Sequence, residues 1–155
     1  MPKHSAQQQG IAVDTARIAG ELNAAAVIFR EKFKAVAERP GSATLGVRWR
    51  DLESVSAPSF AFDTFSGTVI AAFDHVDSAS ASDGGGLRGR YRLYRFDGNP
   101  IKPELKEFWA FLTNESGSAT WAIPGQFEWN TGIDSDVVSF VYRSLLEFYG
   151  TIDQV

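Results

Sequence analysis

Five arginines stand at alternate positions in two segments of the chain, and they are Arg48, Arg50, Arg88, Arg90 and Arg92. Alternate residues of a β-strand point to one face of a sheet, so each segment would hold its guanidinium groups on a single face. Guanidinium groups bind carboxylate and phosphate through paired hydrogen bonds. If the two strands lie close together, the spacing predicts one binding surface for an acidic protein or an anionic small molecule.

The same arginines can instead belong to a solvent-exposed sheet face that carries its own counter-charges. Carboxylates on adjacent strands would then pair with the guanidinium groups, and such exposed pairs contribute little to stability. Candidate carboxylates in the nearby sequence are Asp51, Glu53, Asp63 and Asp74. We favour this structural interpretation, because a short pattern without a wider motif often matches by chance.

His75 is the second candidate for chemistry, since the other histidine, His4, lies close to the N-terminus. A catalytic histidine needs a carboxylate that orients its ring. Asp74 precedes His75 in a predicted strand and therefore points to the opposite face, whereas Asp77 shares the face of His75 only if the alternation holds. The carboxylates around His75 lack the spacing of a metal site. His75 is thus a candidate catalytic base, with a non-catalytic role favoured.

Aromatic residues are abundant, with twelve Phe, four Trp and four Tyr. The candidates for a pocket or an interface are Phe60, Phe62, Phe73, Trp109, Trp121 and Trp129. Outward-facing aromatic side chains are typical of oligomer interfaces, which predicts a homodimer. An alternative is an apolar pocket between sheet and helices, with His75 at its edge and walls of Phe60, Phe62, Phe73 and Trp121. A third interpretation is that these side chains fill a thick core.

Other motifs give no support for catalysis or for a cofactor. The glycines at 84–86 precede a predicted strand, whereas phosphate-binding loops lead into a helix N-terminus. The Ser-Gly pairs of the chain have no G-x-S-x-G elbow around them. The chain contains no cysteine, which excludes disulfides and thiolate ligands. We therefore expect no cofactor and no metal, and we favour a protein that is not an enzyme.

Length and charge narrow the class of protein further. A chain of 155 residues suits one domain with one core. A net charge of -4 argues against nucleic acid or an anionic membrane as the partner. The apolar stretches are far shorter than the roughly 20 residues of a membrane span, and residues 1–10 lack the apolar region of a secretory signal. We expect a soluble, cytoplasmic protein.

The period of the apolar residues predicts the elements that hold these candidates. Apolar residues recur every three or four positions at 14–39, which is typical of a helix with Asp14 as its N-cap. Alternation and β-branched or aromatic content predict strands at 44–50, 59–65, 68–76 and 87–96.

Residues 103–112 fit either a short helix or a strand, and we favour a strand from Glu107. Two further short strands are predicted at 119–123 and 126–129. A second helix follows at 137–149, with Asp134 or Ser135 as its N-cap and Gly150 as its stop.

This order of elements predicts an α+β domain, in which an antiparallel β-sheet carries a long N-terminal helix and a C-terminal helix on one face. The domain would occupy 14–150, with a disordered lead-in at 1–13, a flexible internal loop at 77–86 and a tail at 151–155. The open sheet face must then meet water, a ligand or a partner. We therefore expect a non-catalytic binding or protein-interaction domain that uses this face and self-associates. The alternative is a small-molecule-binding or hydrolytic domain with an apolar pocket.

Overall fold

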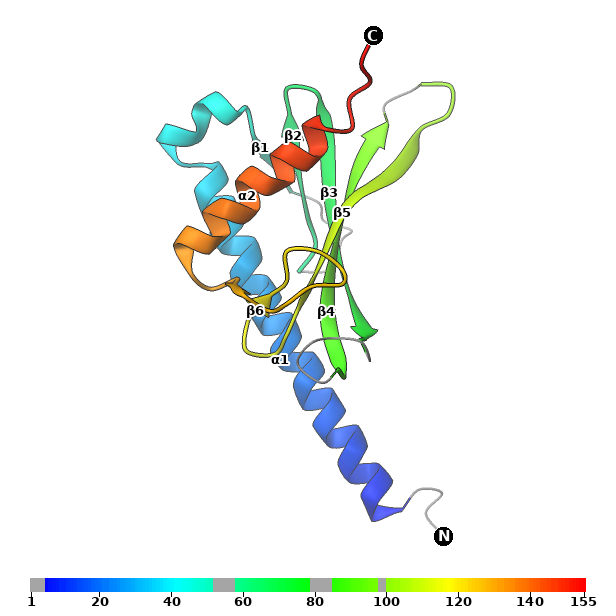
Figure 1. The fold of residues 1–155 in the computed structure, drawn as a ribbon. Helices are drawn as coiled ribbons and strands as arrows, with labels where there is room; N and C mark the ends of the chain where they lie inside the picture. The colour runs from blue at the N-terminus through cyan, green and yellow to red at the C-terminus, as the bar shows by residue number, and fades with distance from the viewer. Residues whose placement is uncertain (1–4, 52–57, 79–84, 98–99) are drawn as a thin grey trace.

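The computed structural model describes residues 5–51, 58–78, 85–97 and 100–155 (Figure 1). The helices are α1 (Ala6–Ala37), the 3-10 helix η1 (Pro40–Leu45) and α2 (Asp134–Tyr149). The strands are β1 (Arg48–Arg50), β2 (Phe60–Thr64), β3 (Gly67–Asp77), β4 (Leu87–Asp97), β5 (Glu104–Thr113), β6 (Ser118–Ala119) and β7 (Trp129–Asn130).

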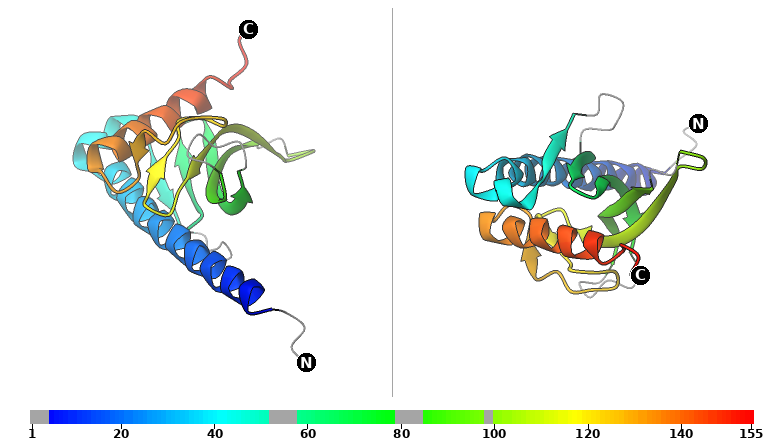
Figure 2. Two further views of the ribbon diagram at one scale, coloured as in Figure 1. Left: turned by 60° about the horizontal axis from the view of Figure 1, so that its bottom comes forward. Right: turned by 90° about the horizontal axis from the view of Figure 1, so that it is seen from above.

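All seven strands form one sheet, in which each strand pairs antiparallel with the next strand of the chain. The sheet curls into a half-barrel, and both helices lie against its inner face (Figure 2). The predicted α+β fold is thereby confirmed. Among the described residues, no helix is long and apolar enough to cross a membrane.

Helix α1 begins earlier than its apolar periodicity predicts. Ser5 is the N-cap, because its hydroxyl accepts a hydrogen bond from the Gln8 backbone N–H while the Gln8 side chain accepts one from the Ser5 N–H. The prediction of Asp14 as N-cap is therefore wrong, and so is the disordered lead-in for residues 6–13. This part of α1 projects beyond the sheet, so it has no buried stripe for a periodicity argument to detect (Figure 1).

The predicted strand at 44–50 is confirmed only at Arg48–Arg50, because Thr44 and Leu45 belong to η1. Pro40 sits in the first turn of η1, where its missing N–H costs nothing. Gly46 ends η1 with a φ of 69°, a left-handed conformation that favours glycine. Strand β1 can start only after this turn, at Arg48.

The hairpin of β2 and β3 and the strand β4 agree with the sequence prediction. Phe62 of β2 lies opposite Val69 of β3, and Phe73 of β3 lies opposite Tyr91 of β4, which places these side chains on the inner face. The predicted flexible loop at 77–86 lies largely outside the described residues, as does Glu53. At its ends, the Ser78 N–H donates to the Gly86 carbonyl oxygen at 2.9 Å.

Strand β5 settles the ambiguity at 103–112 in favour of a strand, whereas the strands predicted at 119–123 and 126–129 shrink to two residues each. Side chains take the backbone groups that a longer strand would pair. The Thr120 hydroxyl accepts a hydrogen bond from the Leu112 N–H at 2.9 Å, and the Trp109 indole donates to the Trp121 carbonyl oxygen at 2.8 Å. Pro124 adds no N–H donor.

Helix α2 starts at Asp134 after Ile133, and its N-cap position has no side-chain hydrogen bond, so the predicted cap by Asp134 or Ser135 is wrong. Asp134 instead forms an ion pair with Lys32 of α1 at 2.7 Å. The hydrogen bond from Lys32 holds the pKa of Asp134 below its ordinary value. This pair ties the start of α2 to α1. The predicted stop at Gly150 is confirmed.

Aromatic rings of α1 occupy the centre of the core. The ring of Phe29 contacts five other rings edge-on, and these belong to Phe33, Phe60, Tyr91, Phe111 and Phe140. They come from both helices and from strands β2, β4 and β5. Edge-to-face ring pairs add stability beyond the area they bury, so Phe29 joins the sheet and both helices into one core.

Candidate functional site

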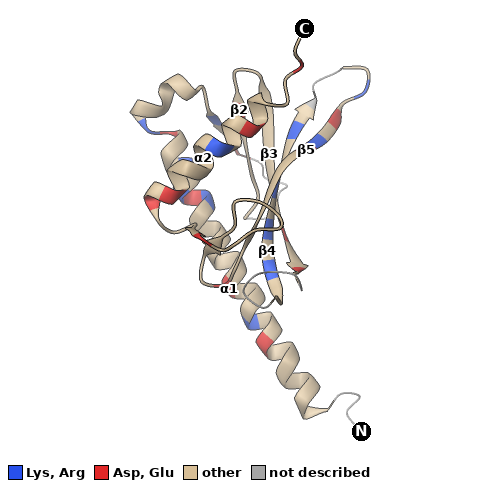
Figure 3. Ribbon diagram, in the orientation of Figure 1, with Lys and Arg blue, Asp and Glu red and all other residues tan. Residues whose placement is uncertain are grey.

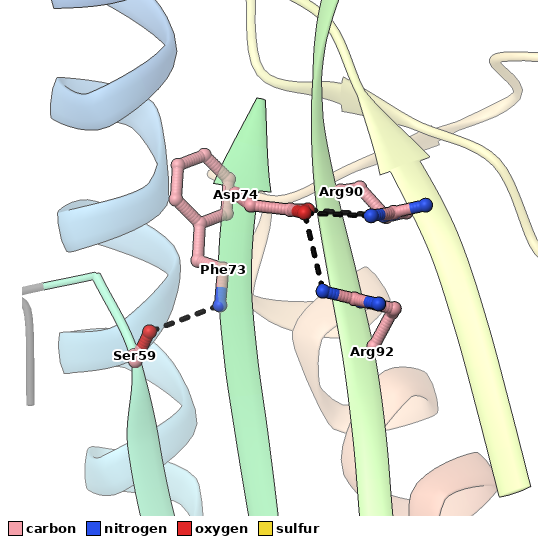
Figure 4. A network of polar contacts seen from close by, with 5 residues as sticks. All are labelled: Ser59, Phe73, Asp74, Arg90 and Arg92. Carbon is pink, nitrogen blue, oxygen red and sulfur yellow. Dashed lines mark hydrogen bonds and ion pairs between the residues drawn. The ribbon is translucent and has the colours of Figure 1, made fainter. Parts of the chain in front are cut away.

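Strand β4 presents alternate residues to the two faces of the sheet. Tyr91 and Leu93 are buried against the helices, so Arg90 and Arg92 point outward. In the register of β3 and β4, Arg90 lies directly opposite Asp74 and Arg92 opposite Ala72. Figure 4 shows the Asp74 carboxylate turned toward both arginines, while the Phe73 ring lies on the other side of β3.

Asp74 is shared by the two guanidinium groups. Arg90 binds the carboxylate of Asp74 in a bidentate manner, with Nε 3.0 Å from Oδ1 and Nη2 2.6 Å from Oδ2. Arg92 donates from Nη2 to Oδ2 of the same carboxylate at 3.2 Å. The hydrogen bond with Asp74 raises the pKa of Arg90 above its ordinary value. The shared carboxylate therefore holds the two guanidinium groups side by side.

Arg88 has a different role at the start of β4. Its guanidinium donates to the Leu87 carbonyl oxygen at 2.8 Å and to the Gly85 carbonyl oxygen at 2.7 Å. The same group lies over the ring of Phe127, at 5.6 Å from the ring centre. Arg88 thus fixes the chain that enters β4 and joins it to the segment between β6 and β7.

Arg48 and Arg50 belong to a separate part of the sheet. Strands β2 and β3 lie between β1 and β4, which separates the two sets of arginines by roughly 14 Å at the usual strand spacing. The Arg50 Nε lies 3.1 Å from the Asp63 carboxylate, and Arg48 faces Asp63 in the strand register. The predicted single surface of five arginines is therefore not formed. Asp63 and Asp74 serve as counter-charges, as the structural interpretation expects.

A groove of about 520 Å³ opens beside Arg90 and Arg92. Its other walls come from β5 and from the segment after β6, and they are Glu107, Phe108, Trp109, Ala110, Ala122 and Ile123. Ile123 exposes 45% of its surface. The Arg92 guanidinium lies over the Tyr94 ring at 5.8 Å, and its buried Nε has no hydrogen-bond partner within the described part of the chain. The groove thus combines two cations with an apolar wall.

His75 lies on the inner face of β3, next to α1. Its Nε2 is 2.9 Å from the Asn23 side-chain oxygen, so among the described residues an amide and not a carboxylate orients the ring. Asp74 points to the opposite face, as strand alternation predicts. A hollow of about 160 Å³ beside His75 is also lined by Asn23, Pro58, Phe73 and Asp74. The described residues contain no group of three or more side chains suited to hold a metal ion.

The predicted aromatic candidates lie mostly in the core. Phe60, Phe62 and Trp109 are buried, and Phe73 packs on Tyr91. Trp121 and Trp129 are half-buried and stack at 4.2 Å between ring centres.

These aromatic residues belong to one core or pack against it, and they contact different helices within it. Phe60 packs on Phe33 of α1, whereas Trp121 packs on Phe140 of α2. The Arg143 guanidinium lies over the Trp121 ring at 5.3 Å. The core interpretation therefore accounts for these side chains better than an exposed patch does.

Exposed apolar side chains occur instead on the outer side of α1, a surface that the sequence analysis did not consider. Val13 and Ile28 are the large ones, with Gly20 and Ala24 between them. The signal was present as a second three- and four-residue spacing, offset from the buried stripe. Of these residues, only Val13 lies outside the helix predicted at 14–39.

Comparisons of the chain with models of protein families, with curated proteins and with solved structures find no match.

Proposed function

We propose that this protein is a non-catalytic binding domain, whose groove on the outer sheet face receives a partner that presents a carboxylate next to an apolar side chain. The observation that carries the proposal is that Arg90 and Arg92 line the same groove as several apolar side chains. A guanidinium group has five N–H donors. Asp74 receives two from Arg90 and one from Arg92, which leaves donors for a second carboxylate.

Preorganisation supports this assignment. The two-pronged contact with Asp74 fixes Arg90 before any ligand arrives, so binding would immobilise little additional side chain. Glu107 in the groove wall offsets part of the positive charge. A mixed groove of this kind selects one acidic group with an apolar neighbour over a densely charged polyanion such as nucleic acid.

A hydrolytic domain centred on His75 has less support. The hollow beside His75, about 160 Å³, is smaller than the roughly 300–1,000 Å³ typical of small-molecule sites. In the part of the chain that the structure describes, the hydrogen-bond partner of the ring is the Asn23 amide, and no carboxylate bonds to the ring to stabilise an imidazolium. A binding function on the outer face therefore fits the geometry better.

The test compares two short peptides, N-acetyl-Glu-Leu-amide and its neutral counterpart N-acetyl-Gln-Leu-amide, in titrations followed by ¹H–¹⁵N NMR of the full chain. We expect the acidic peptide to shift amide signals of β4, of β5 and of Ile123, more strongly at low salt than at high salt. The neutral peptide should shift them little.

Arg92→Gln should abolish the shifts, because it removes the less constrained of the two cations. Arg50→Gln is the matched control, since Arg50 is also an outer-face arginine with a carboxylate partner, but on the edge strand β1, away from the groove. Equal responses to the two peptides, equal losses in the two variants, or no shifts at all would each refute the proposed function.

A further inference from the structure

The side of α1 that faces away from the core forms a seam of mainly small and apolar residues. Residues three or four positions apart share one side of a helix, because each residue advances about 100°. The seam consists of Val13, Arg17, Gly20, Ala24, Ile28, Glu31 and Ala35. It lies opposite the buried stripe that includes Leu22, Phe29 and Phe33. Every residue of the seam is solvent-exposed, and Val13 and Ile28 expose 68% and 51% of their surface.

The two charges of the seam have opposite sign, and Ala24 lies midway between them. When two copies of α1 are set antiparallel about a two-fold axis at Ala24, Arg17 lies opposite Glu31 of the partner subunit, and the pair occurs twice. In the single chain, Arg17 pairs with Glu21 at 3.0 Å and Glu31 pairs with its neighbour Arg30, so both pairs are local. The reversed seam is thus complementary in charge to itself, which an isologous interface requires.

Side-chain size is complementary in the same register. Gly20 lies opposite Ile28 of the partner subunit, so the smallest residue of the seam faces the largest. A Cβ atom at Gly20 would meet nothing within 4 Å, so there is room for that side chain. Ala24 lies opposite its own copy, which lets the two helices approach closely at the axis. A hollow of about 440 Å³ also runs beside Ile28 and Ala35.

We propose that a second copy of this chain docks on the seam, so that the protein is a homodimer whose two α1 helices pack antiparallel about Ala24. The buried stripes of the two helices then face away from each other, which directs the two sheets to opposite sides of the helix pair. The projecting part of α1 in each copy covers the outer side of α1 in the other. That part carries few charges, as Figure 3 shows, which suits a packed helix surface. This inference does not depend on the groove at Arg90 and Arg92.

The length of the contact sets the expected affinity. Residues 13–35 extend for about 35 Å along a helix axis, at about 1.5 Å per residue. One helix pair of this length is at the lower end of the size range of specific interfaces. We therefore expect a dimer that dissociates in roughly the micromolar range.

The test is sedimentation velocity of the full chain over a range of concentrations. Arg17→Glu should weaken the dimer at least tenfold, because it places two glutamates opposite each other at both ends of the interface. Glu31→Arg should weaken it equally, through paired arginines. An equimolar mixture of the two variants should restore a one-to-one dimer, since both contacts then regain opposite charges. In a parallel pair these residues would not meet, so mixing would restore nothing.

Glu128→Arg is the control for a change of surface charge, because Glu128 is exposed on the segment before β7. It should leave the dimer unchanged. Circular dichroism of every variant should match that of the parent, because Arg17 and Glu31 are exposed. A chain that stays monomeric at all concentrations overturns the proposal. A dimer that both charge reversals leave unchanged, or that mixing the variants does not restore, overturns it as well.

Discussion

The hydroxyl group of Tyr91 lies 3.1 Å from the carbonyl oxygen of Ala26, which joins the middle of β4 to α1 inside the core. The same hydroxyl lies 2.7 Å from the Pro58 carbonyl oxygen, just before β2. Tyr91 is fully buried. The phenol of Tyr91 therefore supplies a polar contact between the sheet and α1 in a region rich in aromatic rings.

Removing this hydroxyl should lower stability without disturbing the packing. Tyr91→Phe leaves the Pro58 carbonyl oxygen buried without that donor, at a cost of about 1–3 kcal/mol. Urea unfolding followed by fluorescence measures the change. Tyr142→Phe is the matched control, because Tyr142 is exposed on α2, and its effect should stay within about 0.5 kcal/mol. Equal stability of the two variants would contradict the assigned contact.

The same phenol should make the fold sensitive to alkali. Burial raises the pKa of Tyr91 well above its ordinary value, and the charge of Arg30 opposes that shift only in part. Below the ordinary tyrosine pKa, near 10, both folded and unfolded chains keep the proton and stability is unaffected. Above it, the unfolded chain releases a proton that the folded chain keeps. The free energy of unfolding should therefore fall as pH rises, by up to about 1.4 kcal/mol per pH unit.

Unfolding curves at successive pH values above the ordinary tyrosine pKa test this expectation. The Tyr91→Phe variant lacks the titrating group, so its stability should fall less steeply with pH than that of the parent. Parallel pH profiles for parent and variant would show that Tyr91 does not contribute.

The centre of the core should tolerate truncation poorly. Phe29→Ala removes a ring that contacts rings of both helices and of three strands, and we expect a loss of about 3–5 kcal/mol. Leu146→Ala, at an exposed position of α2, should change stability by less than about 0.5 kcal/mol. Thermal unfolding measures both. A Phe29→Ala variant with the same melting temperature as the parent would mean that α1 does not pack as described.

The fold could be predicted wherever one face of an element is buried. The stripe of Phe29 and Phe33 identified α1, and alternation around Tyr91 identified β4, because burial on one side imposes the period of the element. The start of α1 was missed for the same reason, since residues 6–13 bury no face. The segment after β6 was misread because its aromatic residues alternate, while Thr120 and Trp109 occupy the backbone groups that a strand would pair.

The candidate site could be predicted only in part. Alternation correctly placed Arg90 and Arg92 on the face opposite the core and named Asp74 as a counter-charge. The distance between the arginines of β1 and those of β4 depends on the strand order, which local sequence does not encode. The wall formed by Ile123 comes from an irregular segment with no periodic signal. Long-range register and irregular backbone were therefore the two obstacles.

The last prediction concerns Asp74, the counter-charge that the two arginines share. Asp74→Asn leaves Arg90 and Arg92 side by side without the carboxylate that neutralises them, so it should lower stability at low salt. Asp74 and both arginines are about one third exposed, and solvent screening limits the loss to about 1 kcal/mol. High salt should reduce the loss further, because it screens the repulsion between the guanidinium groups. Urea unfolding at two salt concentrations measures both effects. Asp63→Asn is the control, because Asp63 forms an ion pair with Arg50. It should lower the free energy of unfolding by less, and its effect should depend less on salt. A loss for Asp74→Asn that is independent of salt would mean that Asp74 acts through packing and not through its charge.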